Sequence, residues 1–190
     1  MARAGEVIDN PVTGERMTFL KTASDTNGTL LEVRLQLRPN ANNASAHVHP
    51  RQVERITVVD GTLQLALGGE PERTLSAGDT VTIGTGVPHY WQNRSGLQAE
   101  LRVEYEPARN TEEFFETFFA LGRAGRTDAA GVPDLLQISL SAPHFGIYLA
   151  HPPAWLQKAA FTLLGPLALM LGYRKHFPAV GRHPSAQLAR

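Results

Sequence analysis

The chain of 190 residues has no cysteine and no excess of charge of either sign. Without cysteine there is no disulfide framework, no thiolate zinc site and no cysteine nucleophile. Lys and Arg together number 18, as do Asp and Glu, so the formal net charge is zero. A neutral chain lacks the basic footprint with which proteins hold nucleic-acid phosphates, so we expect no nucleic-acid partner. The first ten residues contain acidic side chains and no apolar run, which predicts no signal peptide and a cytoplasmic location.

The chain does have enough apolar material for a core. Hydrophobic residues make up 42% of the sequence and charged residues 19%, a balance typical of a globular protein rather than of a disordered polyelectrolyte. At roughly 150 residues per domain, the length fits one domain with an extension, or two very small domains.

Residues 6–107 show the pattern of an all-β domain. Short apolar or alternating runs are separated by turn residues such as Asn27-Gly28, Asp60-Gly61 and Gly68-Gly69, at the spacing found in sandwiches and barrels. In the last run, apolar and charged residues alternate, as in a half-buried strand. We predict strands over residues 16–21, 30–38, 53–59, 62–67, 80–83 and 97–106.

After Pro107 the pattern becomes helical. Thr111 is the expected N-cap of a helix that carries a phenylalanine stripe over residues 114–119 and ends near residues 122–125. Pro133 is placed to open a second helix through about residue 140, and a third is expected after Pro152-Pro153. The chain is therefore divided into a β-domain over residues 6–107 and a helical, basic and apolar extension over residues 108–190.

Three histidines and one glutamate stand out by their spacing. His47 and His49 alternate, so on a strand both side chains would point to the same face. Glu54 follows five residues later, and His89 lies after the next glycine-rich turn. Imidazole nitrogens and a carboxylate oxygen are ligands that divalent transition metals accept. A lone histidine is more often a surface or hydrogen-bonded residue, so the wider pattern decides.

That wider pattern consists of two spaced motifs. The first reads His47-Val48-His49, four residues, Glu54, six residues and Gly61; the second reads Gly78, five residues, Gly84-Thr85-Gly86, two residues, His89, three residues and Asn93. This spacing resembles the two motifs of the cupin superfamily over residues 30–105. Ala41 stands where the first motif opens with glycine, and Gly84 stands where the second has proline, so the loops there are expected to differ.

The resemblance implies an all-β fold, a double-stranded β-helix or jelly-roll barrel, here with a C-terminal α-helical extension. It also implies one divalent transition metal in the barrel mouth, with Fe, Mn, Ni, Co, Cu and Zn all compatible. The implied ligands are His47, His49, Glu54 and His89.

Strand alternation predicts a substrate pocket beside these residues. Side chains that share a face with Glu54 or His89 are expected to line it, and two from the neighbouring run are expected to add apolar wall. The predicted pocket residues are Ile56, Val58, Val81, Ile83 and Trp91.

Fold does not determine function, so several functions are compatible with this site. The favoured hypothesis is a mononuclear metal enzyme, resembling quercetinase-like dioxygenases, that acts on a small organic molecule, with Glu54 also serving as the catalytic base. A metal-dependent isomerase or lyase would use the same ligands. A non-catalytic module that binds a small molecule or a metal, and a metal that only staples the barrel, are the remaining alternatives.

The neutral total hides a separation of charge along the chain. Asp134 is the last acidic residue, and the 56 residues after it carry five Lys or Arg, so that segment is +5 and residues 1–134 are −5. The same segment contains the apolar residues 159–173, which are too few for a membrane-spanning helix of about 20 residues, and Gly165-Pro166 is expected to interrupt them.

Because a helix that is apolar on all sides is usually buried in protein, we expect this stretch to cover its own barrel or that of a partner subunit. A membrane partner is not expected, although contact with an anionic membrane surface remains the alternative. A homodimer is expected because an open sheet has edges to protect. Either the phenylalanine stripe or the apolar tail would supply its interface.

Overall fold

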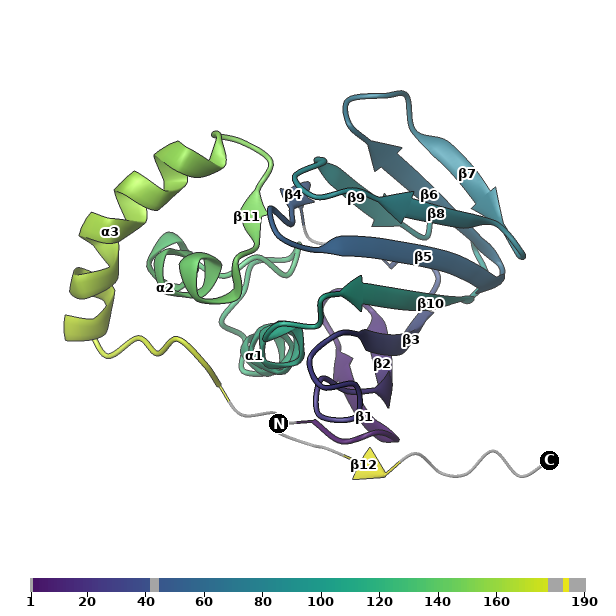
Figure 1. The fold of residues 1–190 in the computed structure, drawn as a ribbon, viewed down its shortest axis with the longest axis horizontal. Coiled ribbons are helices and arrows are strands. Elements are labelled where there is room, and N and C mark those ends of the chain that lie inside the picture. Colours follow the sequence, from purple (N-terminus) through teal and green to yellow (C-terminus); the bar gives the residue numbers. More distant parts are fainter. Residues whose placement is uncertain (1, 42–44, 178–182, 185–190) are drawn as a thin grey trace.

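Two antiparallel sheets form a barrel, and three helices lie on one side of it (Figure 1). The computed structural model describes residues 2–41, 45–177 and 183–184. The larger sheet has the strand order β12 (His183–Pro184), β1 (Glu6–Asn10), β2 (Glu15–Lys21), β3 (Leu31–Leu37), β10 (Ala99–Glu106), β5 (Val53–Asp60) and β8 (Thr80–Ile83). The smaller sheet has the order β11 (Tyr148–Leu149), β4 (His47–Val48), β9 (His89–Gln92), β6 (Thr62–Leu67) and β7 (Arg73–Ser76).

The core fills the space between the sheets because their inward positions are almost all apolar. In β10, which pairs with both β3 and β5, Leu101, Val103 and Tyr105 are buried while Arg102 is exposed. Leu63 and Leu65 of β6 join them from the smaller sheet. This alternation is the period-two pattern of a strand with one buried face.

The expected jelly-roll barrel with C-terminal helices is confirmed. All six predicted strands are present, each within two residues of its expected ends. Six other strands in the described part of the chain were not among the predicted ranges, namely β1, β4, β7, β9, β11 and β12. Arg73–Ser76 buries only Leu75, so it carries little apolar signal.

The cap of the first helix and both ends of the second differ from the sequence predictions, whereas the first helix ends and the third begins where expected. Helix α1 is Thr111–Arg123, and its N-cap is Asn110 rather than Thr111. Helix α2 is Leu135–Phe145; the Asp134 side chain caps it by accepting a hydrogen bond from the Gln137 backbone N–H, and the helix continues past residue 140. Asp134 is a stronger cap than Pro133 because its carboxylate satisfies a free N–H group of the first turn.

Helix α3, Ala154–Met170, continues through Pro166, so the expected interruption at Gly165-Pro166 is wrong. A proline removes only one helical hydrogen bond, and α3 packs along α2, with the Gly165 backbone lying against Leu140. Within the described residues, no helix has both the length and the apolar character needed to cross a membrane.

The helical segment contacts the barrel at several points, and two of them place the helices beside one end of it. Phe115 and Phe119 of α1 are buried in the barrel core. Strand β11, which follows α2, pairs with β4, so that Leu149 lies opposite His47. The helices therefore stand next to the barrel end where β4 lies (Figure 1).

Candidate functional site

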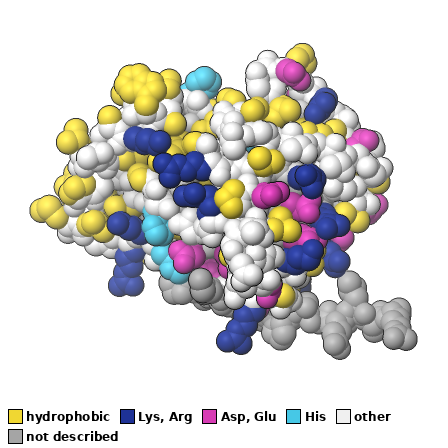
Figure 2. All heavy atoms as spheres, viewed as in Figure 1, with side chains coloured by type: hydrophobic (Ala, Val, Ile, Leu, Met, Phe, Trp, Pro, Cys, Tyr) yellow, Lys and Arg dark blue, Asp and Glu magenta, His cyan; other side chains and the backbone are white. Residues whose placement is uncertain are grey.

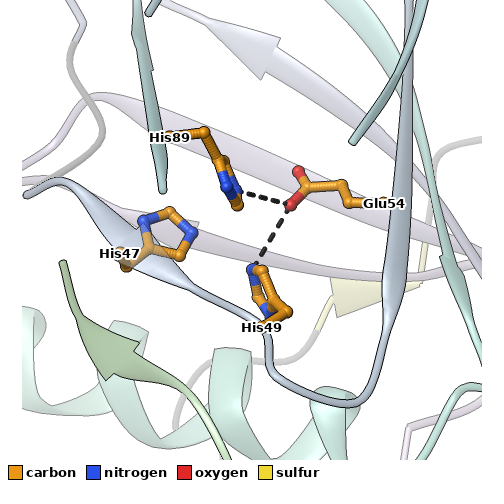
Figure 3. Close-up of side chains that lie close together, drawn as sticks. All are labelled: His47, His49, Glu54 and His89. Carbon is orange, nitrogen blue, oxygen red and sulfur yellow. Dashed lines mark hydrogen bonds and ion pairs between the residues drawn. The ribbon is translucent and has the colours of Figure 1, made fainter. Parts of the chain in front are cut away.

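The four predicted ligands converge at one point in the barrel, although they come from both sheets (Figure 3). His47 begins β4 and pairs in register with His89 of β9, while Glu54 lies on β5 of the larger sheet. One ligand atom from each of the four side chains lies within 4.8 Å of the others. His49, Glu54 and His89 are buried, and His47 is half-buried.

Backbone carbonyls orient two of the imidazole rings. Nδ1 of His47 lies 2.9 Å from the Ser45 carbonyl oxygen, and Nδ1 of His89 lies 2.9 Å from that of Val87. A carbonyl oxygen can only accept, so each Nδ1 is the donor and each neutral ring keeps its lone pair on Nε2. This is the arrangement by which proteins prepare histidine as a metal ligand.

Glu54 is the anionic centre of the group. Its Oε2 lies 3.0 Å from His89 Nε2 and 3.3 Å from His49 Nε2 (Figure 3). Burial would raise the pKa of Glu54, but the two facing histidines outweigh burial and hold that pKa below its usual range. Burial lowers the pKa of His89, but Glu54 outweighs it, so that pKa is raised.

His47 is held as a neutral imidazole. Burial, assisted by neighbouring His49 and His89, lowers the pKa of His47 to about 3. Its Nε2 is therefore a free lone pair at neutral pH. Among the described residues, buried Nδ1 of His49 has no hydrogen-bond partner and buried Nε2 has only the 3.3 Å contact with Glu54, which is uncommon for buried polar atoms.

These observations fit a divalent cation. A nitrogen lone pair that faces a carboxylate oxygen is repelled unless a proton or a cation lies between them. A cation would also give His49 a partner. Three imidazoles and one carboxylate could hold one divalent metal ion, and this donor set does not select among Fe, Mn, Ni, Co, Cu and Zn.

A cavity of about 120 Å³ opens beside His47 and His49. Only part of its wall comes from the barrel. Helices α1 and α2 and the segment around β11 close the other side with mostly apolar side chains, namely Phe114, Phe115, Phe118, Val132, Pro133, Ile138, Ser141, Ala142, Phe145, Ile147, Tyr148 and Leu149.

The predicted pocket residues are divided between the cavity wall and the core. Trp91 lines the cavity. Ile56, Val58 and Ile83 instead lie in the hydrophobic core, and Val81 packs against it. Alternation identifies the inward face of a strand but not the depth along it, and each two-residue step from Glu54 moves about 7 Å further into the barrel.

Two further cavity residues were not identified from the sequence. The Tyr105 hydroxyl donates to Oε1 of Glu54 across 3.3 Å, and burial raises the Tyr105 pKa, with both Glu54 and Glu15 contributing. Glu15 is buried, its Oε2 accepts a hydrogen bond from the Thr13 hydroxyl, and burial raises its pKa to about 7, against the lowering effect of that hydrogen bond. Strand alternation could have identified Glu15, because it lies two residues before buried Met17 and therefore on the same face of the strand.

The family model described as "Cupin domain" matches residues 33–104, which include the four clustered residues and end before α1. An RmlC-like cupin from Shewanella frigidimarina is 23% identical to this chain, with 56% of this chain and 86% of that one covered and a TM-score of 0.48.

KdgF from a Halomonas species is 21% identical, with 52% of this chain and 84% of that one covered and a TM-score of 0.46. A predicted oxalate decarboxylase from Thermotoga maritima is 18% identical, with 56% of this chain and 98% of that one covered and a TM-score of 0.48. No curated protein matches the sequence.

Proposed function

Because residues 33–104 of this chain form a cupin domain, we propose that it is a mononuclear metal enzyme, of the quercetinase-like dioxygenase kind, acting on a small, mainly apolar organic molecule. One observation carries the proposal. The group formed by His47, His49, Glu54 and His89 borders a cavity whose other walls are aromatic and aliphatic. A metal ion that served only to stabilise the barrel would not require such a cavity.

The proposed ligand atoms are Nε2 of His47 and His89, a ring nitrogen of His49 and a carboxylate oxygen of Glu54. A divalent ion bound there supplies Lewis-acid polarisation of a substrate oxygen and, for a redox-active metal, electron transfer with O₂. The Ser45 and Val87 carbonyls hold two of the rings in place, so the ligand set is preorganised.

The apolar wall selects and encloses the substrate. Trp91 from the barrel and Phe115 and Phe118 from α1 offer aromatic surfaces to a planar molecule. Each Å² of apolar surface that the substrate and the wall bury together contributes about 25 cal/mol to the free energy of binding. The same wall excludes water, which strengthens every electrostatic interaction within the cavity.

Glu15 is the better-placed group for proton transfer. Glu54, predicted to double as the base, has Oε2 against two histidines and Oε1 engaged by Tyr105. Glu15 lines the same cavity, and its pKa of about 7 is near the value at which a group can both accept and donate a proton. We therefore propose Glu15 as the acid–base residue.

Glu15 also favours a second candidate, a metal-dependent isomerase or lyase. Such reactions move protons without consuming O₂, and a carboxyl group that titrates near neutrality suits them. Oxygen uptake separates the two candidates, because only the dioxygenase consumes O₂ with its substrate.

The first test is elemental analysis of the protein purified without added nickel or chelator. We expect about one equivalent of a divalent transition metal, lost in the His47→Ala/His49→Ala double variant. An oxygen-uptake screen over small phenols and diketones follows, with Glu15→Gln as the variant that should keep metal and lose turnover. A chain that neither carries nor takes up metal would refute the enzyme proposal and leave a metal-free binding module.

A further inference from the structure

Helix α3 presents an apolar surface to the solvent. Within the described residues, ten large hydrophobic side chains are exposed, and seven of them lie between residues 155 and 171. The most exposed of these seven are Met170 at 84%, Leu163 at 79% and Trp155 at 70%. A stripe of four residues, Gln157, Phe161, Gly165 and Ala168, is the buried part of the helix. The expected burial of the apolar tail therefore holds for one narrow face only.

The charged side chains of α3 and of the described residues that follow it are all basic, and the acidic group nearest to them in the sequence is Asp134 at the α2 cap, which accepts a hydrogen bond from the Tyr173 hydroxyl. No acidic residue follows Asp134 in the sequence, and Lys158, Arg174 and Lys175 are all exposed. In Figure 2, hydrophobic side chains cover the left end of the molecule, where α3 lies, and no acidic side chain is visible among them. The face is thus apolar in its centre and basic at its ends.

An anionic lipid bilayer complements this surface better than a second copy of the chain does. Two copies that met through α3 would bring cations against cations, with no carboxylate in either segment to compensate. The phenylalanine stripe is already used within the chain, where Phe115 and Phe119 enter the core. At 17 residues α3 does not span a bilayer, but an exposed apolar face with basic flanks is typical of a helix that lies in the membrane interface.

We propose that α3 docks the protein onto the surface of an anionic lipid bilayer. Trp155, Leu163 and Met170 enter the boundary between headgroups and acyl chains, while Lys158, Arg174 and Lys175 face the lipid phosphates. This docking is independent of the proposed reaction, since none of these residues lines the cavity.

The test is co-sedimentation of the full chain with vesicles of phosphatidylcholine, with and without phosphatidylglycerol. We expect binding to the anionic vesicles, weakened by salt because screening shortens the range of the attraction. Leu163→Glu/Met170→Glu should lower the partition coefficient more than about tenfold. Leu97→Glu, at a position 74% exposed on the barrel, is the matched control and should bind as the wild type does.

Charge is tested separately with Lys158→Glu/Arg174→Glu, which should also lower anionic binding by more than about tenfold. Equal binding to neutral and anionic vesicles, or unchanged binding by the α3 variants, would overturn the proposal. So would light scattering that shows a wild-type dimer which Leu163→Glu/Met170→Glu converts to a monomer, because α3 would then be a subunit interface. Circular dichroism that matches the wild type establishes that each variant is folded.

Discussion

The buried carboxyl group of Glu15 makes the stability of the protein depend on pH in a specific direction. Burial raises its pKa from 4.5 to about 7 in the folded protein, so the folded state retains a proton that the unfolded chain has lost. The resulting stabilisation is fully present below the unfolded-state pKa and is lost as pH rises through about 7. Replacing Glu15 with glutamine removes the titration but keeps an oxygen for the Thr13 hydroxyl.

The size of the effect follows from the two pKa values. A shift from 4.5 to about 7 corresponds to a loss of about 2–3 kcal/mol in the free energy of unfolding between about pH 5 and pH 8.5. For a chain of this length the loss equals roughly 5–10 °C in melting temperature. The Glu15→Gln variant should lack this component and gain on the wild type as pH rises.

Urea unfolding at a series of pH values measures this component as the difference between wild type and variant. The protein is first stripped of metal with a chelator, because a nearby cation would lower the Glu15 pKa. Subtracting the variant removes the titration of the histidine cluster, which both proteins share. Glu70→Gln, at an exposed position, is the matched control and should follow the wild type. A flat difference curve, or one in which the wild type gains stability at high pH, would refute the reasoning.

Three other predictions concern the ligands, the wall and a turn. His89→Ala should lower metal affinity at least about tenfold, measured by competition with a chromophoric chelator; unchanged affinity would remove His89 from the ligand set. Phe118→Ala should weaken binding of aromatic ligands by about tenfold in calorimetry while the metal content stays constant. Gly61→Ala should lower the free energy of unfolding in urea by about 2 kcal/mol more than Gly28→Ala does. Both positions have a positive φ, but only a Cβ added at residue 61 would meet a backbone oxygen, at 2.8 Å.

The barrel and its ligand cluster could be predicted because their signals are local. The alternation of β10 and the turn residues around it mark a half-buried strand without any knowledge of its neighbours. The spacing of the candidate ligands matches two sequence motifs, and the two sheets bring these side chains together in the fold, namely His47, His49, Glu54 and His89. The strand pairing of His47 with His89 is a direct consequence of the antiparallel register.

The cavity wall was beyond such reasoning because it is made by contacts between distant segments. Phe145 of α2 and Tyr148 of β11 meet the barrel mouth from about 100 residues further along the chain, and no periodicity within either segment reveals which surface it will cover. Ile56 and Val58 face inward as predicted, but depth along β5 places them in the core. An acidic residue such as Glu15, at the start of a strand, usually faces water.

The helical segment belongs to the candidate site rather than only flanking it. Strand β11 pairs with β4, so the backbone that carries His47 is held by the segment after α2. The same segment supplies Tyr148 and Leu149 to the cavity, and α3 packs on α2 behind it. Residues 33–104 alone would keep the four clustered side chains but leave the cavity open to water, so we infer that barrel and helices act as one functional unit.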